Sequence, residues 1–251
     1  MRILLSNDDG FDAPGMEVLK RIANALSDDV IIVAPAKEQS GASRSLTLHD
    51  PIRIIKHSET EYAVEGTPTD CVMMALNHIF KDNPPDLILS GVNRGGNLGE
   101  DVLYSGTVAA ASEGTLLGVR SIALSQCIMD ADEIYWETAE TKAVEIINKL
   151  LGFEWGDGTL MNINFPPVPA DQVTGVAVTR QGKRDLSNLL IDARVDARGR
   201  EYFWLGYRPS VGTPGEGDDL HAVARGEVSV TPLNLNLTAD PLLDKLKQTL
   251  A

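Results

Sequence analysis

The sequence has little cysteine and no long hydrophobic run. Only two of its 251 residues are cysteines, Cys71 and Cys127, and they stand too far apart for a metal-binding motif. They exclude a disulfide scaffold, and we expect two buried thiols in the reducing cytoplasm. No apolar stretch reaches the roughly 18 residues that a membrane span needs. The N-terminal residues turn acidic too early for a secretory signal. We therefore expect a cytoplasmic protein without a membrane anchor.

Positive charge is also scarce. Lysine and arginine number 22 against 36 aspartates and glutamates, which gives a net charge of -14. A surface this acidic repels polyanions at long range, so binding to nucleic-acid polymers and to anionic membranes is disfavoured. The hydrophobic content of 43% is that of an ordinary globular protein. The length suits one large α/β domain or a domain with an appendage.

The first half of the sequence alternates short apolar runs with helical patterns. The run Val30–Ala34 (VIIVA) is apolar on both faces, as expected for a central strand of a parallel sheet. Strands that alternate with helices imply right-handed crossovers and a parallel sheet covered by helices on both faces. The other strands predicted here are Arg2–Ser6, Asp86–Ser90 and Ser121–Ser125, and the predicted helices are Gly15–Leu26, Thr69–Phe80, Gly106–Leu117 and Trp136–Leu151.

The second half is more extended. Residues Gln181–Arg200 show little periodicity and are interpreted as a projecting arm or a contact with a partner. We expect a core over residues 1–170 and a C-terminal extension over residues 171–251 that is not an independent domain. The predicted elements of this half are strands at Leu160–Asn164, Val173–Thr179, Tyr202–Leu205 and Glu227–Thr231, and a terminal helix at Pro241–Leu250.

An acidic pair follows the first predicted strand, in the segment Ser6–Gly10 (SNDDG). Ligands of an open parallel sheet bind beyond the carboxyl ends of its strands. Asp8 and Asp9 repel each other there unless a cation or a proton intervenes, and hard oxygen ligands favour Mg²⁺ or Mn²⁺ over zinc. The alternative interpretation is a turn at Asp9 with Asp8 as a helix cap, since such turns are common.

Two further polar loops leave the same edge of the predicted sheet. The first contains Ser40 within PAKEQSGAS, and the second contains Asn93 within SGVNRGGNLG. A hydroxyl and a carboxamide oxygen from these loops complete an all-oxygen metal site, with water in the remaining positions. Each loop alone is an ordinary polar connection, and it is the convergence of three loops that favours a metal site.

The second loop is rich in glycine, which lets backbone N–H groups approach a ligand closely. It is followed by Ser105, Gly106 and Thr107, where a predicted helix begins. The free N–H groups and partial positive charge of a helix N-terminus suit a phosphate group. Capping of the helix by Ser105 or Thr107 is the alternative. Beside a metal site we favour phosphate binding, because a cation and backbone donors neutralise phosphate within an acidic protein.

Five segments carry a resemblance to a known family. They are long, correctly ordered and spread over most of the chain. The segments are ILLSNDDG with APG (residues 3–15), SGASRSLTL (40–48), GTPTDC (66–71), SGVNRGGNLGEDVLYSGTVAAASEG (90–114) and VSVTPL (228–233). Together they resemble the SurE family, the stationary-phase survival proteins, which are metal-dependent nucleotidases.

The resemblance implies a Rossmann-like three-layer α/β core with a mostly parallel sheet. It also implies a C-terminal β-hairpin and helix that make the contacts of a homodimer or homotetramer. The implied reaction is hydrolysis of nucleoside 5′-monophosphates, with broader phosphomonoesterase activity on 3′-nucleotides and short polyphosphate. The family's ligands of one divalent metal ion fall here on Asp8, Asp9, Ser40 and Asn93, and its phosphate contacts on Asn97, Ser105, Gly106 and Thr107.

In such a reaction Asp8 has two alternative roles. Either Asp8 attacks phosphorus and forms an aspartyl-phosphate, or a water bound to the metal attacks and Asp8 accepts its proton. His221 is a candidate for the acid that protonates the leaving group, if its segment folds over the site. The sequence leaves open the preferred nucleotide and the choice between Mg²⁺ and Mn²⁺.

The rival hypothesis is a dinucleotide-binding module without catalysis. The first strand–helix turn lacks the Gly-x-Gly-x-x-Gly pattern of such modules. Its acidic pair would also repel a pyrophosphate unless a metal bridged them. A binding module should hold its ligand equally well after chelation, so metal dependence separates the two hypotheses.

Overall fold

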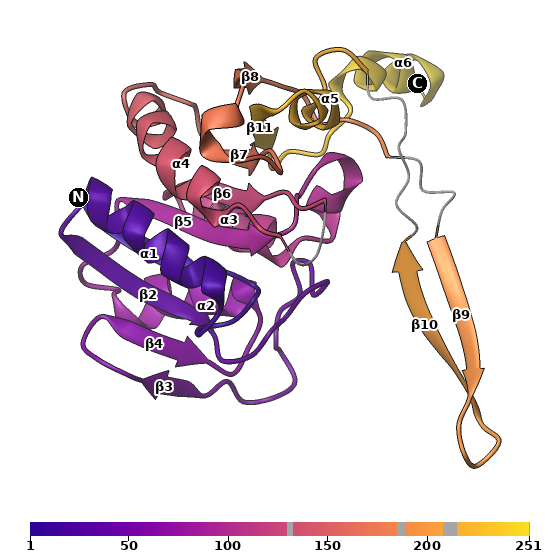
Figure 1. Cartoon of the computed structure of the whole chain (residues 1–251), viewed down its shortest axis with the longest axis horizontal. Helices are drawn as coiled ribbons and strands as arrows, with labels where there is room; N and C mark the ends of the chain where they lie inside the picture. The colour runs from indigo at the N-terminus through magenta and orange to yellow at the C-terminus, as the bar shows by residue number, and fades with distance from the viewer. Residues whose placement is uncertain (130–132, 185–188, 208–214, 251) are drawn as a thin grey trace.

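Helices cover both faces of a nine-stranded sheet in the computed structural model, which describes residues 1–129, 133–184, 189–207 and 215–250 (Figure 1). The strands are β1 (Arg2–Ser6), β2 (Asp29–Pro35), β3 (Ile54–Lys56), β4 (Glu61–Val64), β5 (Leu87–Arg94), β6 (Arg120–Gln126), β7 (Thr159–Phe165), β8 (Gly175–Val178) and β11 (Glu227–Asn234). They lie in the order β3-β4-β2-β1-β5-β6-β7-β11-β8. The strands from β4 through β7 in this order are parallel, whereas β3 and β11 run antiparallel to β4 and β7. The predicted mostly parallel α/β core is confirmed.

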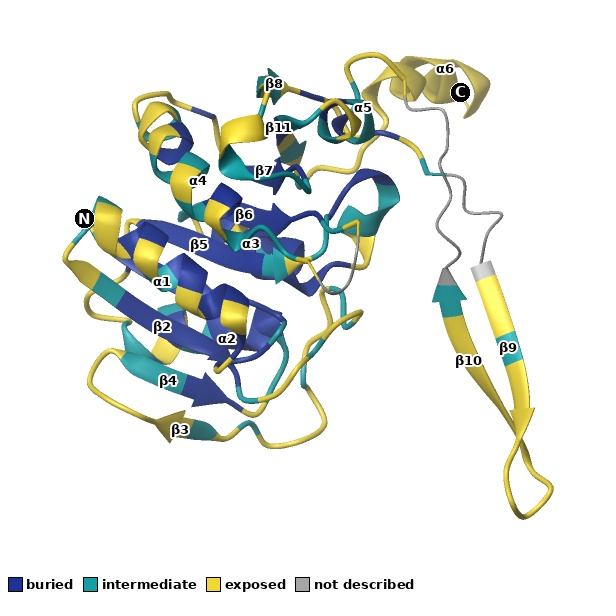
Figure 2. Ribbon diagram, viewed as in Figure 1, coloured by how far each residue is buried: buried dark blue, intermediate teal, exposed yellow. Residues whose placement is uncertain are grey.

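Two pairs of helices form the outer layers. Helices α1 (Pro14–Leu26) and α4 (Trp136–Leu151) pack together on one face of the sheet, and α2 (Pro68–Met74) and α3 (Gly106–Leu116) pack together on the other. In α1 the apolar residues recur every three or four positions, so one stripe is buried against the sheet. The central strands are buried along most of their length (Figure 2). The carboxyl ends of these rigid strands therefore make a firm platform for a site.

The predicted helix over Thr69–Phe80 is wrong in its second half. Helix α2 ends at Met74 and continues as a π-helical turn over Ala75–Ile79, in which Phe80 donates its backbone N–H to the carbonyl of Ala75. The Asn77 side chain donates to the carbonyl of Met73, and such side-chain bonds compete with regular helical ones. Two 3-10 turns, over Gly99–Leu103 and Ala170–Gln172, complete the connections of the core.

The C-terminal region adds two strands to the sheet and one separate hairpin. Strands β9 (Leu189–Val195) and β10 (Glu201–Tyr207) pair antiparallel and project away from the core (Figure 1). The C-terminal β-hairpin that the family resemblance implies is therefore confirmed, and its first strand falls within the segment Gln181–Arg200 that we interpreted as a projecting arm. Apolar residues are exposed along both strands of the hairpin, so the sequence shows no alternation that would reveal a half-buried strand.

Two helices follow the hairpin. The short helix α5 (Asp219–Ala224) was not predicted, and α6 (Asp240–Leu250) confirms the predicted terminal helix. Within the described ranges, no helix is both long and apolar enough to cross a membrane. The division of the chain at residues 170 and 171 stays a prediction, and β8 and β11, from the C-terminal side of it, belong to the same sheet as the core.

Candidate active site

Asp8 lies in a buried turn at the carboxyl end of β1. The Asn7 side chain holds this turn, because its carboxamide donates to the carbonyl of Gly10 at 2.8 Å and accepts from the Gly10 N–H at 3.3 Å. Gly10 has a φ of +106°, a conformation that residues with a Cβ rarely adopt. Asp8 is only 4% exposed, whereas Asp9 is half-buried. The two carboxylates thus sit at the edge of the sheet where the sequence places them.

The N-terminus of α3 meets Asp8 directly. The Thr107 hydroxyl donates a hydrogen bond to Oδ1 of Asp8. Gly106 packs so closely that a Cβ built on it would lie 2.6 Å from the Asp8 Cβ. The Ser105 hydroxyl accepts the backbone N–H of Val108 at 3.1 Å, which makes Ser105 the N-cap of α3. The structure therefore gives Thr107 and Ser105 defined roles as a donor to Asp8 and as a cap. The phosphate contacts of this segment stay a prediction.

The second carboxylate is tied to the end of β5. The backbone N–H of Arg94 donates to Oδ2 of Asp9 at 3.1 Å, which brings Asp9 beside the loop that carries Asn93. The Asn93 side chain is half-buried and donates its Nδ2 to the carbonyl of Gly95 at 2.8 Å. That bond orients the carboxamide without using its oxygen. Asp9 and Asn93 are thus brought together from strands whose sequences lie far apart.

The loop after β2 lies against the acidic turn as well. The backbone N–H of Gln39 donates to the carbonyl of Asp8 at 2.7 Å, and that of Phe11 donates to Pro35. Ser40 itself is exposed, and its hydroxyl is bonded to Glu38 at 3.0 Å. The structure therefore places the Ser40 loop at the site, while a role for the Ser40 hydroxyl as a metal ligand stays a prediction.

Buried negative charge defines the electrostatics of the site. The pKa of Asp8 is raised from 3.8 to about 6. Burial is the largest cause, the hydrogen bond from Thr107 lowers the pKa, and the charge of Asp9 makes a smaller contribution that raises it. The pKa of Asp9 is also raised, mainly by burial, with a smaller contribution from Glu38. Glu38 is a carboxylate that we did not single out from the sequence, although it stands two residues before Ser40.

These observations fit a divalent cation. Paired carboxylates that resist ionisation are stabilised in their charged form when a cation lies between them, and Asp8, Asp9, Ser40 and Asn93 offer only oxygen donors. Among the described residues no cluster of three or more histidine, cysteine, aspartate or glutamate side chains forms a metal site. The predicted set differs from such clusters because it combines two carboxylates with a hydroxyl and a carboxamide.

Asn97 lies further along the glycine-rich loop and is buried. Its side chain Nδ2 donates to the Ser125 hydroxyl at 2.8 Å, and its backbone N–H donates to Oδ1 of Asn164 at 2.8 Å. Ser125 and Asn164 were missed by the sequence analysis. The available signal was the run MNINF in β7, in which two asparagines occupy positions that a strand buries.

His221 lies in α5, the helix whose first residue, Asp219, contacts the end of the glycine-rich loop at Gly99. The carboxylate of Asp219, two residues earlier, accepts the backbone N–H groups of Gly99 and Gly182, each at 2.9 Å. In the part of the chain that the structure describes, His221 makes no hydrogen bond or ion pair with Asp8 or Asp9. Its role as the leaving-group acid stays a prediction.

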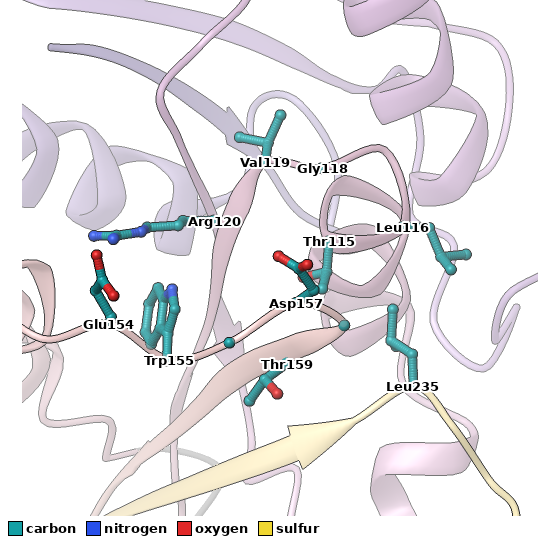
Figure 3. Close-up of a pocket in the computed structure, with 12 residues that line it drawn as sticks. Thr115, Leu116, Gly118, Val119, Arg120, Glu154, Trp155, Asp157, Thr159 and Leu235 are labelled. Carbon is teal, nitrogen blue, oxygen red and sulfur yellow. The ribbon is translucent and has the colours of Figure 1, made fainter.

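The cavity shown in Figure 3 does not belong to this site. It has a volume of about 590 Å³ and lies where β6 and β7 begin, between Arg120, Trp155, Asp157 and Leu235. Because β6 and β7 run parallel to β1, their first residues stand at the opposite edge of the sheet from Asp8. We therefore assign the candidate active site to the carboxyl edge.

Fold and site together define an α/β protein of the Rossmann-like class, in which an acidic pair and a helix N-terminus meet at the carboxyl edge of a parallel sheet. Residues 3–188 match the model of the family described as Survival protein SurE. The chain belongs to the SurE family.

Full-length relatives support this assignment. The chain is 54% identical over 253 residues to the 5′-nucleotidase SurE of Caulobacter vibrioides (strain NA1000 / CB15N), with 100% of this chain and 96% of the relative covered. It is 52% identical over 254 residues to the 5′-nucleotidase SurE of Beijerinckia indica, with 100% and 97% covered. The crystal structure of the SurE protein from Aquifex aeolicus superposes with a TM-score of 0.85 at 37% identity and covers 100% of both chains. The predicted family and fold are confirmed.

Proposed function

We propose that this chain hydrolyses nucleoside 5′-monophosphates to a nucleoside and inorganic phosphate, in a reaction that needs one divalent metal ion per subunit, Mg²⁺ or Mn²⁺. The observation that carries the proposal is the buried Asp8, which is held beside Asp9 by the N-terminus of α3. Relatives that match the chain over its full length and are named 5′-nucleotidase SurE support hydrolysis of a nucleotide phosphate ester. We extend the proposal to other phosphomonoesters, including 3′-nucleotides and short polyphosphate.

We assign a separate role to each group of residues in the site. Asp8, Asp9, Ser40 and Asn93 would hold the cation, which when bound neutralises charge on the phosphoryl group. The backbone N–H groups at Ser105–Thr107 and the Asn97 carboxamide would hold phosphate oxygens, where they stabilise the charge of the transition state. Asp8 then either attacks phosphorus or accepts the proton of the attacking water. Thr107 keeps the Asp8 carboxylate in one orientation for either role.

Removal of the metal or of Asn93 tests the proposal. We expect phosphate release from AMP, GMP and an aryl phosphate with Mg²⁺ or Mn²⁺, and none with EDTA. Loss of an outer partner of a metal site lowers activity by about 10–100-fold, so Asn93→Ala, which removes a direct ligand, should lower it at least tenfold. Asn148→Ala, on the exposed surface of α4, is the matched control and should leave the rate unchanged.

Two other results would contradict the proposal. Phosphate release that survives both EDTA and Asn93→Ala would exclude the metal-dependent site. Absence of release in every condition would favour the rival dinucleotide-binding module, whose ligand affinity should not change on chelation.

We also propose that the chain works in the cytoplasm as a homodimer or homotetramer, with β9, β10 and α6 at the contacts. Phe203, Trp204 and Leu205 of β10 are 58%, 61% and 73% exposed, which is rare for three consecutive large apolar residues unless a partner covers them. No residue of α6 is buried, yet Leu242, Leu246 and Leu250 lie along one side of it. A second copy of the chain would cover both surfaces.

A charge placed on the hairpin should weaken this self-association. Trp204→Lys introduces a cation opposite Asp192 on β9, so the hairpin keeps a favourable cross-strand pair while its apolar surface is interrupted. We expect the mass measured by light scattering to shift towards the 27.1 kDa of one chain. Glu201→Lys, on the same strand, is the control and should retain the wild-type mass. An unchanged mass for Trp204→Lys would exclude β10 from the contacts.

A further inference from the structure

Strand β7 carries two fully buried asparagines, Asn162 and Asn164. Side chains alternate between the faces of a sheet, so these two share one face with Leu160, which packs against α3. The residues between them, Met161 and Ile163, join the apolar core on the other face. Burial of a carboxamide is unfavourable unless hydrogen bonds compensate for the lost water, so a strand that only had to pack would carry apolar residues here.

Both asparagines donate a hydrogen bond to the same residue. The carbonyl of Asn97 accepts from Nδ2 of Asn162 at 2.9 Å and from Nδ2 of Asn164 at 3.2 Å. The N–H of Asn97 donates to Oδ1 of Asn164 at 2.8 Å, and its side chain donates to the hydroxyl of Ser125 on β6. The backbone and the side chain of Asn97 are thus both bound by side chains from the sheet.

The loop around Asn97 needs such anchors. Gly95 and Gly99 have φ values of +116° and +57°, and glycine gives a loop more freedom than any other residue. Asp219 anchors the far end of the loop through the N–H of Gly99. Without the bonds from β7, the loop segment from Gly95 to Gly99 would have fewer restraints, and Asn97 would no longer be fixed in one orientation for binding a ligand.

We propose that Asn162 and Asn164 are positioning residues, which together with Ser125 fix Asn97 in the orientation that binds the phosphate of the substrate. The inference rests on the proposed function, because it takes Asn97 as a phosphate contact. It goes beyond that function because it assigns a role to two residues that reach the site only through Asn97. The oxygen of Asn162 has no hydrogen-bond partner among the described residues. A buried acceptor without a partner is unfavourable and offsets the hydrogen bond that Asn162 donates. The positioning role of Asn162 can therefore be measured apart from its contribution to stability.

Asn162→Leu tests this separation. The substitution removes one hydrogen bond to Asn97 together with a buried oxygen that has no partner, and these two effects on stability oppose each other. We expect the melting temperature to stay within about 2 °C of the wild type. We expect the KM for AMP and the inhibition constant of inorganic phosphate to rise about tenfold, as for one lost hydrogen bond in the site, with kcat within threefold. Asn164→Leu, which removes two bonds, should raise both constants further.

The buried hydroxyl of Thr179, directly after β8, provides the matched control. Thr179 bonds Ser229 at 2.8 Å and Thr231 at 2.7 Å, without a contact to Asn97. Thr179→Val should lower the melting temperature by a few degrees and leave KM and the phosphate constant unchanged. The positioning role is overturned if Asn162→Leu leaves both constants at wild-type values, or if Thr179→Val raises them equally.

A double substitution shows whether the effect passes through Asn97. In the background of Asn97→Ala the phosphate contact is already lost, so Asn162→Leu should add less than a twofold change. An equal effect in both backgrounds would mean that Asn162 acts elsewhere.

Phosphate affinity, measured by calorimetry with Mg²⁺ present, is read independently of hydrolysis. A wild type that binds phosphate but releases none from AMP would therefore contradict the proposed function alone, whereas failure to bind phosphate would overturn the inference.

Discussion

Replacement of Asp8 by asparagine is expected to lower kcat by at least about a thousandfold under either of the two roles that we propose for Asp8. Asparagine cannot attack phosphorus as a carboxylate does, nor accept a proton from water at neutral pH. Its carboxamide oxygen still accepts the hydroxyl of Thr107, which binds Asp8 in the structure, so the turn should keep its shape. Phosphate release from AMP with Mg²⁺ or Mn²⁺ measures the loss.

The same substitution should stabilise the metal-free protein at alkaline pH. The pKa of Asp8 rises from 3.8 to about 6 on folding, mainly because the carboxyl is buried. A group whose pKa is raised by folding contributes stability below its unfolded value, and this contribution disappears as the pH rises through the folded value. The difference corresponds to about 3 kcal/mol between about pH 3 and pH 8. The carboxamide of the Asp8→Asn variant does not titrate, so the variant avoids this loss.

Thermal unfolding in EDTA measures this effect. At pH 8 we expect Asp8→Asn to melt several degrees above the wild type, and the difference should shrink as the pH falls below about 5. Added Mg²⁺ should raise the melting temperature of the wild type more than that of the variant, because the cation binds only the folded site. Asp12→Asn, in the exposed part of the same loop, is the control for both activity and melting. Equal melting curves for wild type and Asp8→Asn at pH 8 would contradict the assignment of a buried, destabilising carboxylate.

The substitution Gly106→Ala is expected to lower activity about a hundredfold. A methyl group on Gly106 would lie 2.6 Å from the Cβ and 2.9 Å from Oδ2 of Asp8, which is too close for either side to remain in place. Asp8 must therefore move, and small displacements of a reacting group reduce rates steeply. Overpacking should also destabilise the protein by about 1–3 kcal/mol, partly offset by the better helix propensity of alanine.

Gly152→Ala is the matched control for this prediction. Gly152 is the C-cap of α4, and the nearest atom to its added methyl group would be the carbonyl oxygen of Lys149 at 3.5 Å, an ordinary contact. We expect wild-type activity and a melting temperature close to that of the wild type. If Gly106→Ala kept full activity while folded, the close approach of α3 to Asp8 would have no catalytic importance.

The sequence predicts the parts of this molecule that depend on local patterns. Continuous apolar runs mark β1 and β2, and a 3.6-residue period marks α1, because these patterns follow from the geometry of each element. The position of Asp8 and Asp9 at the end of the first strand follows in the same way, since carboxyl ends of parallel strands share one edge. The hairpin of β9 and β10 follows from the family resemblance and not from a local pattern, because the exposed residues of β9 lack an alternating one.

Other features depend on how distant parts of the chain pack together. The period of a strand places Asn162 and Asn164 on one face, but nothing in the order of the residues shows that Asn97 lies above them. Likewise the interaction of Thr107 with Asp8 joins residues that are 99 positions apart. Such contacts arise only when separate elements pack, and their geometry depends on all the intervening crossovers.

The sequence by itself therefore determined the class of fold, the family and the loops that carry the acidic pair, because each is expressed in short segments with their own periodicity or motif. The tertiary structure alone decided which groups touch Asp8, how deeply Asp8 is buried and what holds Asn97. Those properties depend on distances between elements, since burial and close approach set the pKa of a carboxyl group and the restraint on a loop.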